Sequence, residues 1–124
     1  TRAWGIRLTP NCGSLTILLS ETFAGKTLDN LRANGMLAVT CTRPTDHMTC
    51  QLKGHVRRIT PVTAIDREVS QRWHCEFSAE LKAVGVSSSL IEGWIVEPTV
   101  AVEVDVTEVF DQTPGPGAGR KVRP

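Results

Sequence analysis

The stretch MLAVTCTRPTDHMTCQLKGHVRRI, residues 36–59, decides the fold class of this chain. Residues 36–42 are apolar and partly β-branched, and residues 48–59 alternate between apolar and polar side chains, which is typical of strands. Between them, RPTD at 43–46 has the residue types of a turn. The stretch therefore predicts two strands, and the isolated Gly54 predicts a bulge or the close approach of another group.

The sequence on either side predicts further strands and a few helices. Strands are expected over 3–8, 15–19 and 99–110, and a short helix over 25–34. Apolar residues spaced three and four apart over 62–84 predict an amphipathic helix opening at Thr60-Pro61, with a candidate break at His74-Cys75. A capping-box pattern at 89–92 predicts one more turn. Several antiparallel strands with few helices indicate a mainly β (α+β) fold, in which a small barrel closes to remove its edges.

Composition limits the classes of function. The 124 residues predict a single domain, 1–124, and the net charge of +1 predicts no general attraction to nucleic acid or to membranes. No apolar run approaches the roughly 20 residues of a membrane helix. The four cysteines include no CxxC pair, and the chain shows no secretion signal, so we expect a reducing, cytoplasmic location.

Both ends of the chain carry expectations of their own. The sequence opens on Thr1 and reads there like the middle of a protein, so we expect an N-terminal segment to be missing. Residues 111–124 are expected to form a C-terminal loop, because 112–119 (QTPGPGAG) is too rich in glycine and proline for a helix or a central strand.

Three segments carry a resemblance to a known family: TLDNL at 27–31, NGMLAVT at 34–40 and QLKGHV at 51–56. They resemble the pyridoxamine-5'-phosphate-oxidase-like FMN-binding split barrels over about residues 25–60, and the order of elements agrees over most of the chain. The resemblance implies an antiparallel six-stranded split β-barrel with flanking helices. It also implies a homodimer that holds flavin mononucleotide (FMN) at its interface.

The resemblance implies a set of cofactor-binding residues. Arg2 matches an arginine that reaches the flavin phosphate, and Arg7 matches a basic position near the ring. Lys53 joins the set because it shares a strand face with Gln51, so that the two could donate to one edge of the flavin. An ordinary solvent-exposed residue is the alternative for Arg7, for Lys26, and for the pair Gln51 and Lys53. The expected cofactor-binding residues are Arg2, Arg7, Ser20, Glu21, Lys26, Thr27, Thr49, Gln51 and Lys53.

Position in the predicted elements refines these roles. Arg2 and Arg7 lie five apart, so on a strand they face opposite ways, and Arg2 is the better phosphate ligand. Lys26 and Thr27 are expected at the start of a helix, where unpaired backbone amides suit a phosphate. The apolar residues of 62–84 are expected to form core or dimer packing.

Two departures from the family pattern bear on the reaction. Thr27 stands where a second basic residue is usual, and the C-terminal end lacks the run of tryptophan and arginine that pyridoxamine-phosphate oxidases use on their substrate. We therefore expect an FMN-dependent oxidoreductase that acts on a small organic molecule or a nicotinamide, but not on pyridoxamine phosphate. The alternatives are a non-catalytic flavin-binding or storage module, or a deazaflavin- or haem-binding relative with His47 or His55 as the axial ligand. No metal site is expected.

Overall fold

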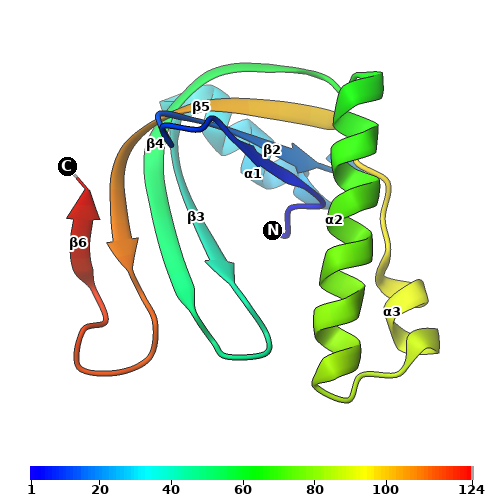
Figure 1. Ribbon diagram of the computed structural model, residues 1–124. Helices are drawn as coiled ribbons and strands as arrows, with labels where there is room; N and C mark the ends of the chain where they lie inside the picture. The colour runs from blue at the N-terminus through cyan, green and yellow to red at the C-terminus, as the bar shows by residue number, and fades with distance from the viewer. Residues whose placement is uncertain (124) are drawn as a thin grey trace.

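The computed structural model describes residues 1–123, which form an α+β fold with a six-stranded antiparallel sheet and three helices (Figure 1). The strands are β1 (Ile6–Leu8), β2 (Ser14–Leu19), β3 (Met36–Thr42), β4 (Thr49–Pro61), β5 (Val100–Asp111) and β6 (Arg120–Arg123). The helices are α1 (Glu21–Asn34), α2 (Ala64–Ala83) and α3 (Ser88–Trp94). None of these helices is both long and apolar enough to cross a membrane.

The strand order explains why the sheet stays open. The path runs β1-β2-β5-β4-β3, and β6 pairs with the far end of β5. Within residues 1–123, β1 and β3 do not pair with one another, although the sheet curves strongly (Figure 1). The antiparallel α+β sheet expected from the sequence is therefore confirmed, whereas its closure into a barrel is not.

The core lies between α1 and the first half of the sheet. Val100, Val102 and Val104 alternate along β5, so that their side chains reach the same face. Leucines from α1 and β2 pack against them and are almost fully buried. The buried residues of this core are Leu15, Ile17, Leu19, Ala24, Leu28, Leu31, Val100, Val102 and Val104.

Gly54 marks a β-bulge, as the sequence predicts. The register between β4 and β5 shifts at Lys53/Gly54, which leaves Thr107 as an extra residue in β5. A Cβ atom on Gly54 would lie 2.1 Å from the backbone oxygen of Asp105. Glycine is therefore required at this point because a neighbouring strand passes too close for any side chain.

Several element boundaries differ from the expected ones, and β1 begins at Ile6 rather than at residue 3. α1 begins at Glu21 rather than at residue 25, because the extended backbone of Ser20 serves as its N-cap. Thr60 and Pro61 remain in β4, and α2 begins after Thr63, whose side chain forms a capping box with Asp66. α2 is continuous through the candidate break at residues 74–75.

The expected C-terminal loop is only partly a loop. Residues 112–119 form the turn that their glycines and prolines predict, and Gly115 and Gly119 adopt positive φ values there. The turn reverses the chain, and residues 120–123 pair with β5 as β6, so the prediction of a loop is wrong for them. Residue 124 lies outside the described residues.

Candidate functional site

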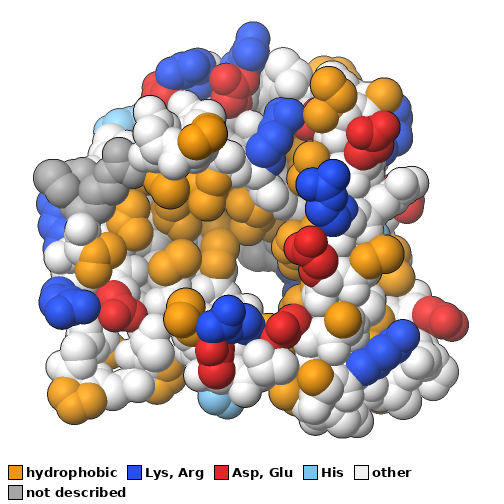
Figure 2. Space-filling view, viewed as in Figure 1, with side chains coloured by type: hydrophobic (Ala, Val, Ile, Leu, Met, Phe, Trp, Pro, Cys, Tyr) orange, Lys and Arg blue, Asp and Glu red, His pale blue; other side chains and the backbone are white. Residues whose placement is uncertain are grey.

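A groove of about 510 Å³ separates the free edge of β3 from α2 and the first residues of the chain. Figure 2 shows the molecule hollowed between α2 and an apolar area of the sheet. One side of the groove is formed by six consecutive residues of β3, 37–42. Arg2, Thr27, Trp73 and Phe77 lie on its other sides. We call this space the β3 groove.

The backbone of β3 offers hydrogen-bonding groups to the β3 groove. The amide of Val56 donates to the oxygen of Gly35 (2.7 Å) and the amide of Arg43 to the oxygen of Met48 (2.9 Å), so these two pairs are hydrogen-bonded pairs of the ladder. Such pairs alternate along antiparallel strands. The backbone groups of Ala38 and Thr40 therefore point away from β4, toward the groove.

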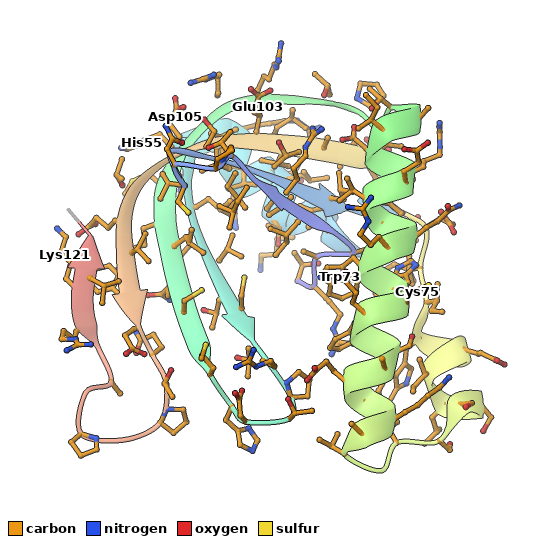
Figure 3. All side chains as sticks on the ribbon, viewed as in Figure 1. His55, Trp73, Cys75, Glu103, Asp105 and Lys121 are labelled. Carbon is orange, nitrogen blue, oxygen red and sulfur yellow. The ribbon has the colours of Figure 1, made fainter. Side chains whose placement is uncertain are left out.

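The wall opposite β3 is aromatic. The rings of Trp73 and Phe77 stack at 4.7 Å between centroids with an interplanar angle of 23°. Trp73 lies on the side of α2 that faces the sheet (Figure 3). The sequence places both residues in the apolar stripe of 62–84, but it does not single them out as site residues. The available signal was their spacing of four, which brings two aromatic rings onto one helix face.

Arg2 gives the β3 groove its charge. It is the one lysine or arginine among the groove's described lining residues, and no aspartate or glutamate is among them. Its guanidinium lies 5.9 Å from the centroid of the Trp4 ring, a cation–π contact. The groove therefore combines apolar walls with a single cation, which favours a ligand that is largely apolar and carries an anionic group.

Of the cofactor-binding residues expected near the start of α1, some belong to the helix cap and one lines the β3 groove. Ser20 is buried as the N-cap, and the amide of Glu21 donates to the side-chain oxygen of Thr99 at 2.9 Å. Lys26 is exposed and Thr27 lines the groove, but both lie in the second turn of the helix. The prediction that they sit beside the unpaired amides of the first turn is therefore wrong.

Arg7 has a structural contact instead of a free guanidinium. Its Nη2 lies 3.3 Å from Oδ1 of Asp66, which is buried at the start of α2. The same carboxylate accepts hydrogen bonds from the amide and hydroxyl of Thr63. Arg7 therefore ties β1 to the cap of α2, and it does not line the β3 groove.

The β4 residues lie on the other face of the sheet from the core. Gln51 and Lys53 alternate with buried Leu52, so they share one face as expected. Lys53 Nζ lies 4.9 Å from the centroid of the Phe110 ring, and Gln51 Nε2 donates to the hydroxyl of Thr40 at 3.4 Å. Thr49 is held by Thr42 and by the turn after β5. Within one chain this group therefore reaches the β3 groove through its contacts with Thr40 and Thr42.

His74 is a polar residue that the sequence analysis leaves among structural or exposed histidines. Its Nε2 is buried and has no hydrogen-bond partner among the residues described. Burial lowers the pKa of His74, while the nearby Glu97 acts in the opposite direction. His74 packs edge-on against Trp4 and Trp73, so it supports the aromatic wall from behind.

Metal binding finds no support in the part of the chain that the structure describes. No three His, Cys, Asp or Glu side chains lie close enough together there to hold a metal ion. His47 occupies the turn between β3 and β4 with a φ of 59° and is exposed.

Comparison with protein-family models, with curated proteins and with solved structures found no match to this chain.

Proposed function

We propose that this protein binds FMN in the β3 groove as a homodimer of the split-barrel class, and that it works as a flavin-dependent oxidoreductase. One observation carries the proposal: the free backbone edge of β3 faces an apolar wall across a groove that holds a single cation. A volume of about 510 Å³ lies within the usual range for small-molecule sites, roughly 300–1,000 Å³.

The chemistry of the groove fits the three parts of FMN. The polar edge of an isoalloxazine ring carries both donors and acceptors, which match the backbone groups of Ala38 and Thr40. The apolar faces of the ring match Trp73 and Phe77. The phosphate matches Arg2, whose forked donors suit a phosphate, and the hydroxyl of Thr27 adds a further donor.

When bound, the flavin supplies hydride transfer at its N5 atom, and the chain supplies binding, orientation and electrostatics. A nicotinamide or small organic substrate would donate the hydride. The described lining residues of the groove include no carboxylate and no histidine, so this proposal assigns no acid–base pair to the protein.

The dimer rests on surfaces that a single chain leaves uncovered. α2 has 20 residues but buries only Asp66 and Ser70, and the side chain of Ile65 is 60% exposed. A second copy that covers this stripe would close the gap between α2 and β3 into a split barrel. It would also bring its own Thr49, Gln51 and Lys53 to the cofactor, as the family resemblance implies.

Titration of the purified chain with FMN tests the binding. We expect flavin fluorescence to be quenched on binding, and Arg2→Gln to weaken the affinity at least tenfold, because a charge-assisted hydrogen bond contributes about 1.5–3 kcal/mol. Arg32→Gln is the matched control, since Arg32 is exposed in the last turn of α1. A chain that leaves flavin fluorescence unchanged would contradict the proposal.

Further titrations separate the alternatives. Parallel additions of a deazaflavin and of haem show which cofactor is preferred, followed by mass spectrometry of the bound species. Anaerobic addition of reduced nicotinamides to the flavin-loaded protein then tests the reaction. Tight binding without bleaching of the flavin by either nicotinamide or by organic reductants would favour a storage module over an enzyme.

A further inference from the structure

Two of the four cysteines face one another across the β3–β4 hairpin. Cys41 of β3 and Cys50 of β4 are direct partners in the antiparallel register. Side chains of direct partners lie on the same face of a sheet. The thiol of Cys50 is close enough to contribute to the raised pKa of Cys41. All four cysteines of the chain are free thiols, but only this pair is brought together by strand pairing.

The ladder fixes the distance between the two backbones. Cys41 lies two residues before Arg43, whose amide bonds to Met48, so Cys41 and Cys50 form a hydrogen-bonded pair of the ladder. The Cα atoms of such a pair are about 5.5 Å apart. Disulfides span Cα separations of about 4.4–6.8 Å, most often near this value. The Cα separation therefore lies within the range of a disulfide, and closing the bond needs the Cβ atoms to approach from about 5 Å to about 4 Å by a small local shift of the two strands.

The surroundings protect the pair from bulky reagents without sealing it off. Both residues are half-buried, and Cys41 lines the β3 groove. Burial, followed by the proximity of Cys50, raises the pKa of the Cys41 thiol to about 11. Cys41 is therefore a neutral thiol near pH 7, and it does not react readily on its own.

We propose that Cys41 and Cys50 form a reversible oxidation site, in which a cross-strand disulfide fastens the edge strand β3 to β4 beside the groove. The proposal goes beyond flavin binding and does not depend on it. In a reducing compartment, disulfides of this kind are transient and serve redox sensing.

The reaction needs a small disulfide such as oxidised glutathione as oxidant. The thiolate of one cysteine attacks the glutathione disulfide, which forms a mixed disulfide and releases one glutathione. The second cysteine then attacks the mixed disulfide and releases the other glutathione. Two S–H bonds and one S–S bond break, one S–S bond forms, and the two protons and two electrons leave with two molecules of reduced glutathione. The second step is favoured because the attacking thiol is already in place.

Oxidation would act on the free edge of β3. This strand is hydrogen-bonded to β4 alone within the described sheet. Its far end therefore depends on one ladder, on the turn at 43–48, and on the hydrogen bonds that Thr45 of this turn donates to Glu80 of α2. A covalent link at residues 41 and 50 would hold that end in place. We expect amide hydrogen exchange over 40–51 to slow at least tenfold in the oxidised chain, with little change in α1.

Peptide mapping of the whole chain tests the proposal. Cleavage before each aspartate places each cysteine in its own peptide: Cys12 in 1–28, Cys41 in 29–45, Cys50 in 46–65 and Cys75 in 66–104. After native incubation with oxidised glutathione, we expect 29–45 and 46–65 to run as one joined species that dithiothreitol separates. The joined species should contain no free thiol, and dithiothreitol should restore one thiol to each of its two peptides.

Variants provide the controls. Cys75→Ser removes an exposed cysteine on α2 (Figure 3) and should leave the joined species unchanged, whereas Cys41→Ser and Cys50→Ser should abolish it. The proposal is overturned if glutathione remains attached to residue 41 or 50, if the joined peptides include 1–28 or 66–104 instead, or if all four thiols persist. The mapping of the wild-type chain decides the matter even if a serine variant fails to fold.

Discussion

The two helices that flank the sheet differ in what they do for it. α1 buries Ala24, Leu28 and Leu31 against β2 and β5, and each of these is at most 5% exposed. α2 is longer, yet both of its fully buried residues are polar. Its apolar stripe is mostly half-buried, and Ile65 and Val84 are exposed. An amphipathic helix is stable when its apolar stripe is covered, so α1 completes the fold of the single chain whereas α2 presents a surface.

Polar contacts and one close approach fix α2 where it meets the sheet. The hydroxyl of Ser70 donates to the backbone oxygen of Trp4 at 2.7 Å. Gly5 lies so close that a Cβ there would be 3.3 Å from the Cα of Ser70. These contacts hold the first half of α2. Its second half stands beside the groove, where Glu80 accepts hydrogen bonds from the amide and hydroxyl of Thr45. The difference between the helices predicts that changes in the covered region affect stability and that changes on α2 affect association, and the following changes test that prediction.

Leu28→Ala should have the largest effect, because it removes a side chain that is 1% exposed at the centre of the α1 contact. Cavities of this kind cost about 3 kcal/mol of the free energy of unfolding. Urea denaturation followed by tryptophan fluorescence measures it. Leu90→Ala on α3 is the control, since Leu90 is 56% exposed and its loss should cost less than about 0.5 kcal/mol. If both substitutions lowered the free energy of unfolding equally, the contact of α1 with the sheet would not be what stabilises the single chain.

Gly54→Ala should come next. The new Cβ would collide with the backbone of Asp105, which has no rotamer to adopt, so β4 and β5 must move apart. We expect a loss of about 2 kcal/mol in urea denaturation. Gly25→Ala is the matched control, because Gly25 lies inside α1 with nothing within 4 Å of the added atom. The free energy of unfolding of that variant should rise by up to about 1 kcal/mol, because alanine has a higher helix propensity than glycine. A decrease would show that α1 has no room for a side chain at this position.

Phe77→Ala tests the open region. The ring is half-buried in the single chain, so the substitution should lower the free energy of unfolding of the monomer by no more than about 1 kcal/mol. If α2 forms the dimer surface, the dissociation constant should rise at least tenfold, or about 1.4 kcal/mol. Analytical ultracentrifugation over a range of concentrations measures it, with exposed Glu76→Ala as the control on the same helix. A variant with wild-type association would count against α2 as the dimer surface.

The sequence predicts local structure well where one strong pattern acts alone. The strand at 36–42 has the predicted bounds, and the bulge at Gly54 follows from the rule that a strand interior rarely uses glycine. The start of α1 was misplaced because Gly25 and Lys26 gave no sign of which residue would cap the helix. β6 was missed because four residues are too few to show a period, and only pairing with β5 makes them a strand.

The site was harder to predict than the fold. Arg2 and Thr27 do reach one groove, but nothing in the local pattern shows that Arg7 pairs with Asp66, 59 residues away. The sequence indicates Trp73 and Phe77 as packing residues, because the apolar residues of a helix have the same spacing whether they pack in a core or line a groove. Contacts between distant segments decide these roles, and a single sequence does not encode them in any local period.

His74 gives the smallest expected effect, and it reports on the junction between the covered and open regions. Burial lowers the pKa of His74 below its ordinary value of 6.5, so the unfolded chain takes up a proton at a pH where the folded chain does not. The stabilisation is therefore present above pH 6.5 and is lost as the pH falls through the lower, folded value.

We expect the free energy of unfolding to decrease from pH 7.5 to pH 5 more steeply in the wild type than in His74→Gln. Glu97→Gln should steepen the decrease, because Glu97 raises the pKa of His74. Urea titrations at each pH, with NMR titration of the His74 ring, measure both, and parallel profiles for the three proteins would show that the ring is hydrated.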